Sequence, residues 1–209
     1  MYCILGIIFK LDERCFVKYP TFLIFGPPGS GKGTQGKSLC ELRGFVHVSS
    51  GDVIRHLDPD SEQGQLFFKY ANRGELAPND GLIVDIVRQY IEMLINTHQF
   101  DPKTQKLLLD GVPRTKTQAK LIESYCDILG VIVLQSVDNQ ELTERLRQRA
   151  QIEGRLDDQK EEVLVKRFKV YEQQTQEVLS HYPSLKQFKV NCLQSKSKVL
   201  EDILNIIPK

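Results

Sequence analysis

The chain has 209 residues, of which 26% are charged and 41% hydrophobic, and its formal net charge is +1. This length fits one α/β domain with a full core rather than two independent domains, and the near-neutral charge gives no general attraction for nucleic acid. The cysteines are scattered and never in CxxC spacing, which suggests neither a disulfide framework nor a zinc site and favours a reducing, cytoplasmic compartment. They are Cys3, Cys15, Cys40, Cys126 and Cys192.

The beginning of the chain is a hydrophobic run from Tyr2 to Phe9. This run is too short to span a bilayer, has no basic segment before it, and is followed by charged residues. We therefore expect residues 1–20 to be an N-terminal extension, an extra strand or tail, rather than a signal peptide. The folded domain is expected to cover residues 21–209.

A glycine-rich loop follows the first predicted strand of this domain. Residues 21–25 are apolar, and the decapeptide GPPGSGKGTQ (26–35) then opens a helical pattern. Glycines let backbone N–H groups turn inward, the helix start adds partial positive charge, and Lys32 can reach terminal phosphates. The spacing matches a Walker-A loop, except that Gly33 stands where a hydroxyl is usual and the hydroxyl follows at Thr34. A plain strand-to-helix turn is disfavoured because strand, loop and helix appear in order. The loop predicts binding of a nucleoside triphosphate.

The remaining elements alternate between strands and helices. Predicted strands cover 45–48, 106–110, 131–134 and 188–190, and predicted helices cover 32–43, 62–73, 81–97, 115–125, 139–150, 160–181 and 195–206. Such alternation predicts an α/β fold with a five-stranded parallel sheet and helices on both faces. Ligands of such sheets bind at the carboxyl ends of the strands.

Three polar clusters are expected at that edge of the sheet. They are DGVPR (110–114), SSGDVIR (49–55), and GRLDD (154–158) with Arg145, Arg149 and Arg167 around it. Planar guanidinium groups bind phosphate oxygens in a bidentate way, so this set suits phosphoryl transfer. Other interpretations stay open at this stage. The arginines of 145–149 could form a solvated helix face, Asp110 could cap a helix, and Asp157 and Asp158 could cap the helix near Lys160.

Several ordered motifs together resemble the adenylate kinases and their relatives, the nucleoside monophosphate kinases. They are GPPGSGKGTQ (26–35), HVSSGDVIR (47–55), GELAP (74–78), DGVPRTKTQ (110–118), ERLRQR (144–149), and GRLDD followed by KRFKVY (154–158 and 166–171). The resemblance covers nearly the whole chain beyond residue 20. It implies a three-layer P-loop kinase fold, with a small acceptor-binding insertion at about 49–78 and a short, zinc-free lid at about 149–158.

The resemblance also implies a role for each site residue. Contacts to ATP would come from Gly29, Ser30, Gly31, Lys32, Gly33, Thr34, Arg145, Arg149 and Gln194. Contacts to the monophosphate acceptor would come from Ser50, Arg55, Glu75, Leu76, Ala77, Gly111, Arg114, Gln118, Arg155 and Arg167. The catalytic group would comprise Lys32, Asp110, Arg114, Arg149, Arg155, Asp157, Asp158 and Arg167. The two lid aspartates would orient arginines, and Asp110 would hold Mg²⁺ only through water.

The acceptor is expected to be AMP. The Gln118 amide can accept from the exocyclic amine of adenine and donate to a ring nitrogen. Ser50, Ala77 and Val112 depart from the residues that are usual in the family, as does Gln194 in the loop expected near the adenine of ATP. We therefore expect Mg²⁺-dependent conversion of ATP and AMP into two ADP, in nucleotide homeostasis, by a monomer without nucleic-acid or membrane partners.

Two alternative functions stay open. The nearer one is the same chemistry on UMP or CMP. The other is a non-catalytic nucleotide-binding regulatory protein, which is disfavoured because Lys32 and the arginines are all present. A GTP-reading switch is disfavoured as well, since the chain has no NKxD-type segment.

Overall fold

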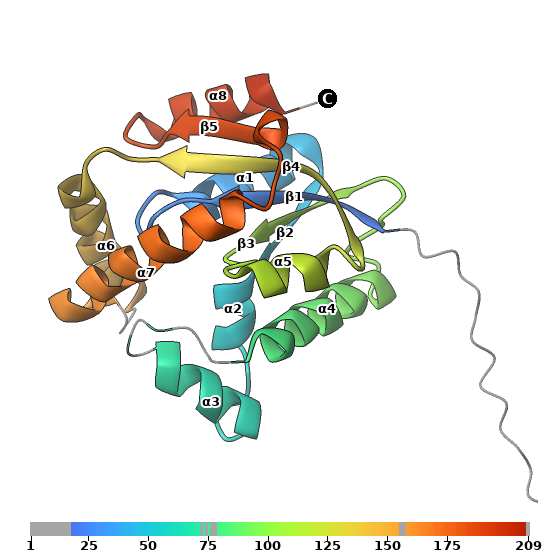
Figure 1. The fold of residues 1–209 in the computed structure, drawn as a ribbon, viewed down its shortest axis with the longest axis horizontal. Coiled ribbons are helices and arrows are strands. Elements are labelled where there is room, and N and C mark those ends of the chain that lie inside the picture. Colours follow the sequence, from blue (N-terminus) through green and yellow to red (C-terminus); the bar gives the residue numbers. More distant parts are fainter. Residues whose placement is uncertain (1–17, 72, 74, 76–78, 155–157, 208–209) are drawn as a thin grey trace, which may run out of the picture.

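The computed structural model describes residues 18–71, 73, 75, 79–154 and 158–207. Within them, one sheet of five parallel strands has the order β2-β3-β1-β4-β5 (Figure 1). The strands are β1 (Tyr19–Phe25), β2 (Phe45–Ser49), β3 (Lys106–Asp110), β4 (Cys126–Gln135) and β5 (Gln187–Asn191). The expected α/β fold with a five-stranded parallel sheet is confirmed.

Helices cover both faces of the sheet (Figure 1). They are α1 (Lys32–Arg43), α2 (Ser50–Arg55), α3 (Glu62–Ala71), α4 (Asp80–Asn96), α5 (Lys116–Ile122), α6 (Asn139–Glu153), α7 (Glu161–Leu179) and α8 (Lys196–Ile206), with a 3-10 turn η2 at Ser184–Lys186. Helices α4 and α5 pack on one face, and α1 and α8 pack on the other. Helices α2 and α3 lie beside the amino end of α4, below the carboxyl edge of the sheet in Figure 1.

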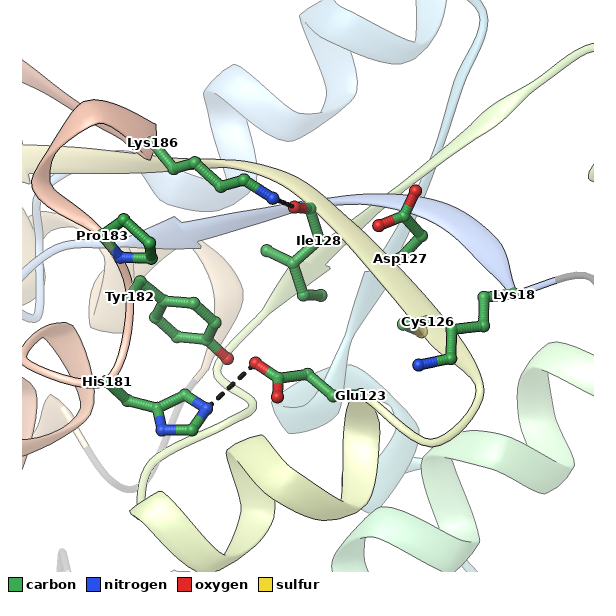
Figure 2. A pocket seen from close by; sticks show the side chains of 9 residues that line it. All are labelled: Lys18, Glu123, Cys126, Asp127, Ile128, His181, Tyr182, Pro183 and Lys186. Atoms are coloured by element: carbon green, nitrogen blue, oxygen red, sulfur yellow. Dashed lines mark hydrogen bonds and ion pairs between the residues drawn. The ribbon is translucent and has the colours of Figure 1, made fainter.

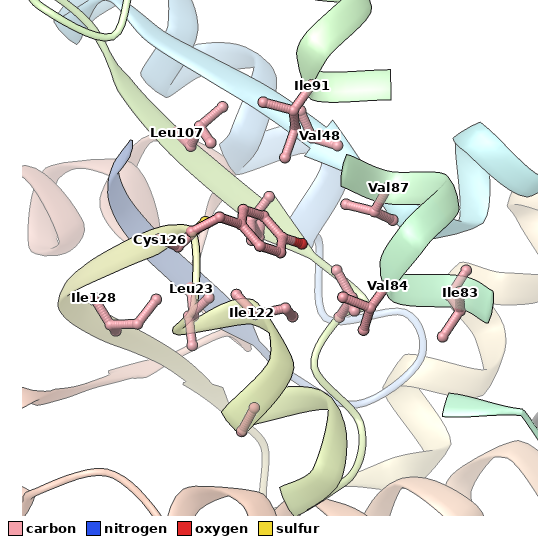
Figure 3. Packing of buried hydrophobic residues seen from close by; sticks show 14 of the residues in the cluster. Leu23, Val48, Ile83, Val84, Val87, Ile91, Leu107, Ile122, Cys126 and Ile128 are labelled. Carbon is pink, nitrogen blue, oxygen red and sulfur yellow. The ribbon is translucent and has the colours of Figure 1, made fainter. Parts of the chain in front are cut away.

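The alternation of side chains along β1 explains the two-sided core. Leu23 belongs to the cluster that α4 and α5 complete, whereas Phe22 and Ile24 belong to the cluster under α1 and α8. Figure 3 shows Val84 and Val87 of α4 facing the strands. Each fully buried side chain of this size contributes about 1.5–3 kcal/mol through removal of apolar surface from water. A strand buried on both faces needs a continuous apolar run, which is the pattern that residues 21–25 show.

The structure differs from the predicted boundaries in several elements. Strand β4 begins at Cys126, five residues before the predicted start at 131. Gly130 lies inside this strand, where a Cβ would lie 2.6 Å from the Phe188 ring and 2.7 Å from the Phe22 ring. This glycine gives two aromatic rings room against the sheet, so the strand passes through it.

Other boundaries move as well. Helix α6 continues to Glu153 rather than ending at residue 150, and Gly154 ends it with φ 65°. Helix α5 covers 116–122 rather than 115–125, with Thr115 as its N-cap and Glu123 as its C-cap. Strand β1 starts at Tyr19, so the last two residues of the expected extension belong to the sheet. Residues 1–17, which hold the rest of that extension, lie outside the described residues. In the ranges that the structure covers, no helix is long and apolar enough to span a bilayer.

Candidate active site

The glycine-rich loop joins the carboxyl end of β1 to the start of α1. Gly29 has φ 80°, and a Cβ at this position would lie 2.6 Å from the carbonyl oxygen of Leu142. Gly31 has φ 88° and is the N-cap of α1, where it supplies no side-chain hydrogen bond to the helix. The positive φ values favour glycine at both positions. Because Gly31 has no side chain that could cap α1, the first N–H groups of the helix are available to an anion. Gly33 and Thr34 follow in the first turn of α1, and Thr34 is exposed.

Lys32 is held across this loop. Its Nζ donates to the carbonyl oxygens of Gly26, at 2.7 Å, and Pro27, at 3.1 Å. Burial lowers the pKa of Lys32 to about 8, Asp110 opposes that shift, and the charges of Arg114, Arg167 and Arg149 lower the pKa further. The lysine therefore lies among like charges, and a bound phosphate group would relieve their repulsion. Ser30 adds a buried hydroxyl with no hydrogen-bond partner among the described residues.

Asp110 ends β3 at the centre of the carboxyl edge. It is 7% exposed and is level with Ile24 on β1 and Ser49 on β2. His47 Nε2 lies 3.4 Å from its Oδ2, a contact that sequence reasoning missed. Gly36 of α1 makes room for that ring, since a Cβ there would lie 2.8 Å from it. The interpretation of Asp110 as a helix cap is wrong.

Ser50, Gly111 and Arg114, which are predicted to bind the acceptor, converge beside Asp110. Gly111 has φ 78°, and a Cβ there would lie 2.6 Å from Ser50 Oγ and 3.3 Å from Arg114 Nη2. Arg114 Nε donates to the Gly111 carbonyl oxygen at 2.8 Å. Desolvation, followed by the charge of Arg167, lowers the pKa of Arg114. Arg55 also contributes to that lowering, while forming an ion pair with Asp52 on α2.

Gln118 lies on α5, one turn after Arg114, and is 4% exposed. Its Oε1 accepts from the Arg114 backbone N–H at 2.7 Å. Its Nε2 donates to Asp80 Oδ1 at 2.8 Å, which joins α5 to the start of α4. The predicted base-reading side chain is thus anchored on both ends of its amide.

Asp158 joins two predicted catalytic arginines from different helices. Its side chain is fully buried and accepts from Arg149 Nε at 2.7 Å, with Arg149 Nη2 at 2.6 Å. Arg167 Nη1 of α7 donates to the other carboxylate oxygen. The cap interpretation of Asp158 is wrong, because the N-cap of α7 is Lys160 and makes no side-chain cap bond. Asp158 instead orients two guanidinium groups near Lys32.

The residues expected along ATP also form contacts. Arg145 Nη1 donates to the carbonyl oxygen of Cys192 at 2.9 Å, which ties α6 to the loop between β5 and α8. In that loop, Gln194 Nε2 donates to the Asn191 carbonyl at 3.1 Å and to Asp202 Oδ2 at 2.8 Å. A solvated helix face is therefore the wrong description of Arg145 and Arg149.

Comparisons with known proteins agree with this arrangement. A family model for adenylate kinase matches residues 24–187. An adenylate kinase of Flavobacterium psychrophilum is 30% identical over 193 residues, which are 88% of this chain and 97% of the relative. That of Thermus thermophilus is 34% identical over 166 residues, or 77% and 81% of the two chains. That of Porphyromonas gingivalis is 39% identical over 158 residues, or 73% and 77%.

The chain belongs to the adenylate kinase family. Membership makes it a nucleoside monophosphate kinase with nucleotide-binding and transferase activity, and it does not favour a regulatory protein without turnover. The β1 loop, the Asp110 strand end and the Asp158 cluster all lie within the matched residues.

One contact in this adenylate kinase family member had no signal in the sequence. Lys166 of α7 donates to Glu75 Oε1 at 2.5 Å, and this bond lowers the pKa of Glu75. It joins an expected acceptor-binding segment to α7 across 91 positions of sequence. Four further predicted site residues lie outside the described residues, namely Leu76, Ala77, Arg155 and Asp157.

A separate cavity of about 410 Å³ lies at the opposite end of the sheet (Figure 2). Its lining includes Lys18 before β1 and Cys126 at the start of β4, so it opens at the amino ends of the strands. Within it, His181 Nε2 and Glu123 Oε1 are 3.0 Å apart. The residues that line it include neither the glycine-rich loop nor an arginine.

Proposed function

We propose that the protein transfers the terminal phosphoryl group of Mg²⁺-bound ATP to AMP, giving two molecules of ADP. The observation that supports this most strongly is the meeting of Lys32, Arg114 and Arg167 around the loop and Asp110. Arg114, Arg167 and Asp110 all act on the pKa of Lys32, and Arg167 and Asp110 also act on that of Arg114. Phosphoryl transfer needs mainly positioning and compensation of charge on phosphate oxygens. This cluster supplies positive charge on both sides of the point where donor and acceptor would meet.

On the donor side, the N–H groups of the loop from Gly29 to Thr34 would bind the phosphates of ATP. Lys32 would leave its two carbonyl partners and follow the migrating group, since the carbonyl oxygens of Gly26 and Pro27 are neutral acceptors and a phosphate oxygen is a charged one. Arg145 and Gln194 would lie along the nucleotide, near the loop between β5 and α8.

On the acceptor side, Ser50, Arg55 and Arg114 would bind the AMP phosphate, with Gly111 allowing its close approach. Arg149 and Arg167 would stabilise the transferred group, held in place by Asp158. Exclusion of water by the closed site would strengthen each of these contacts. Roles for Glu75, Leu76, Ala77, Arg155 and Asp157 remain predictions from the family resemblance.

Mg²⁺ bound with ATP would neutralise negative charge on the phosphate groups. In the part of the chain that the structure describes, no group of three or more His, Cys, Asp or Glu side chains could hold a metal ion. A single carboxylate, Asp110, lies beside Lys32, which fits a cation held by phosphates and water rather than by a protein cage. Asp110 would accept hydrogen bonds from those waters.

We also propose a cytoplasmic monomer that binds small nucleotides alone, in keeping with the net charge of +1 and with the free thiols of Cys40, Cys126 and Cys192. We further propose that the domain begins with β1 at Tyr19 rather than at residue 21. It would contain an acceptor-binding insertion at about 49–78 and a short lid at about 149–158.

A coupled assay with ATP, Mg²⁺ and each of AMP, CMP, UMP and GMP tests the proposal. The expected result is the highest kcat/KM with AMP and no turnover when EDTA is present. Faster phosphorylation of UMP or CMP would overturn the choice of acceptor. Absence of turnover with every acceptor, in folded protein, would overturn the phosphoryl-transfer assignment.

A further inference from the structure

A carboxylate outside the predicted site holds the side chain that is expected to read the base. Asp80, the first residue of α4, accepts from Gln118 Nε2 with Oδ1 and from Thr115 Oγ1 with Oδ2, both at 2.8 Å. Both oxygens have partners, so the carboxylate has a defined orientation. We propose that Asp80 is a positioning residue that determines acceptor specificity, by fixing which way the Gln118 amide faces.

The amide of Gln118 keeps half of its hydrogen-bonding capacity after these contacts. A primary amide has two N–H donors and two acceptor lone pairs. Asp80 uses one donor, and the Arg114 backbone N–H uses one lone pair. One N–H and one lone pair remain, which is the pair of groups needed to bind the edge of a base.

The two partners make a reversed amide unfavourable. Reversal would place Oε1 against the Asp80 carboxylate, which can only accept, and Nε2 against the Arg114 N–H, which can only donate. Two hydrogen bonds would be replaced by two repulsive contacts in a site where Gln118 is 4% exposed. The orientation of the amide is therefore set by Asp80 together with the backbone.

The anchor itself is rigid. Asn79 caps α4 by accepting from the Leu82 N–H at 3.1 Å, and the α4 residues Val84 and Val87 are buried against the sheet. The negative charge of Asp80 also lies in the first turn of α4, where the helix dipole favours it. Through Asp80, the position of the Gln118 amide is fixed relative to α4, which packs on the sheet.

Orientation of an amide distinguishes two classes of purine. A 6-amino purine presents a donor at N6 and an acceptor at N1, whereas a 6-oxo purine of the same size presents an acceptor and a donor in those places. A fixed Gln118 matches one pattern and leaves unpaired groups against the other, while a freely reversing one matches both. This inference rests on the proposed function, and the preferred acceptor would be a 6-amino purine monophosphate.

The test compares AMP with IMP as acceptors in wild-type protein and in Asp80→Asn. The variant keeps the size of the side chain but can donate as well as accept, so reversal of Gln118 becomes easier. The expected result is a fall of about tenfold in the ratio of kcat/KM for AMP to that for IMP. A merely structural role of Asp80 would lower both values by one factor and leave the ratio unchanged, which would overturn the proposal.

Three further variants make the test specific. Asp85→Asn removes the same charge from an exposed position of α4 and should leave the ratio at the wild-type value. Asp80→Ser, which also lacks the carboxylate, should lower the ratio and replaces Asp80→Asn if melting curves show that the latter is unfolded. In the background of Gln118→Ala, Asp80→Asn should no longer change the ratio, because the effect passes through the amide. A ratio that still changes there would contradict the proposal.

Failure of this inference and failure of the proposed function give different results. If wild-type protein does not phosphorylate AMP, the function is wrong. If it phosphorylates AMP well and Asp80→Asn keeps the wild-type ratio, only the role of Asp80 is wrong.

Discussion

Two aspartates hold functional side chains in this protein, and they do so with different chemistry. Asp158 is fully buried between the guanidinium groups of Arg149 and Arg167. Asp80 is half-buried and accepts from two neutral donors, the Thr115 hydroxyl and the Gln118 amide. In the proposed site, the first carboxylate would hold positive charge where phosphate reacts, whereas the second would orient an amide dipole where the base binds. Loss of the first should slow every acceptor equally, and loss of the second should change the preference among acceptors.

The largest effect on kcat is expected from Lys32→Met, which removes a positive charge from the proposed phosphate-binding site and leaves the proposed base-binding residues unchanged. The rate constant kcat should fall by on the order of a thousandfold, because the migrating group loses a charged partner. The melting temperature should stay near the wild-type value, since Lys32 bonds only to loop carbonyls and its burial opposes its charge. Lys37→Met, on the exposed side of α1, is the matched control. Near-normal turnover by folded Lys32→Met protein would show that the loop assignment is wrong.

A loss of about a hundredfold in kcat is expected for Asp158→Asn. This variant leaves two partly buried guanidinium groups without their anion, so the melting temperature should fall as well. The loss should be the same with AMP and IMP, because Asp158 contacts no base-reading residue. The control is Glu144→Gln, which removes an exposed ion pair in which Glu144 Oε2 lies 3.8 Å from Arg147 Nη1. This variant should have almost no effect on kcat.

The pH dependence reports on the same phosphate side. Because the pKa of Lys32 is lowered to about 8, kcat/KM for ATP should fall as pH rises through that value, by about tenfold per unit. Bound phosphate favours the charged lysine, so kcat should stay level to higher pH. In the unfolded chain the pKa of Lys32 has its ordinary value of 10.5, so between pH 8 and pH 10.5 the unfolded state binds this proton more tightly than the folded state. The free energy of unfolding should therefore rise with pH across that window. The fall in kcat/KM should disappear in Lys32→Arg protein, and a fall that persists there would assign it to another group.

The smallest effect is expected on the base side. Gln118→Ala should lower kcat/KM for AMP by about tenfold, and for UMP by less, because only the amide that fits adenine is removed. Phosphate contacts remain, so kcat at saturating AMP should change little. Equal losses with AMP and UMP would mean that Gln118 supports α5 rather than binding the base.

The sequence was most informative where a single short segment contains a complete structural motif. The loop from Gly26 to Thr34, the helix that follows it and the acid at the end of β3 could all be predicted, because glycine geometry and strand ends are local properties. The boundaries of α1 and β3 agree with the prediction to the residue.

Contacts between distant segments could not be predicted in this way. The sequence indicated only that Asp80 lies at the start of a helix. Its hydrogen bond to Gln118, 38 positions away, depends on how α4 and α5 pack together. The same is true of Lys166 with Glu75, and of His47 beside Asp110. The extension of β4 through Gly130 is a further case, because the glycine leaves room for the aromatic rings of Phe22 on β1 and Phe188 on β5.

The most direct test of the central claim measures kcat/KM for AMP and IMP in wild-type, Asp158→Asn and Asp80→Asn proteins side by side. The account predicts that Asp158→Asn lowers both values by one common factor and that Asp80→Asn lowers the AMP-to-IMP ratio by about tenfold. A changed ratio in Asp158→Asn, or an unchanged ratio in folded Asp80→Asn, would contradict the division between placing charge and orienting the base reader.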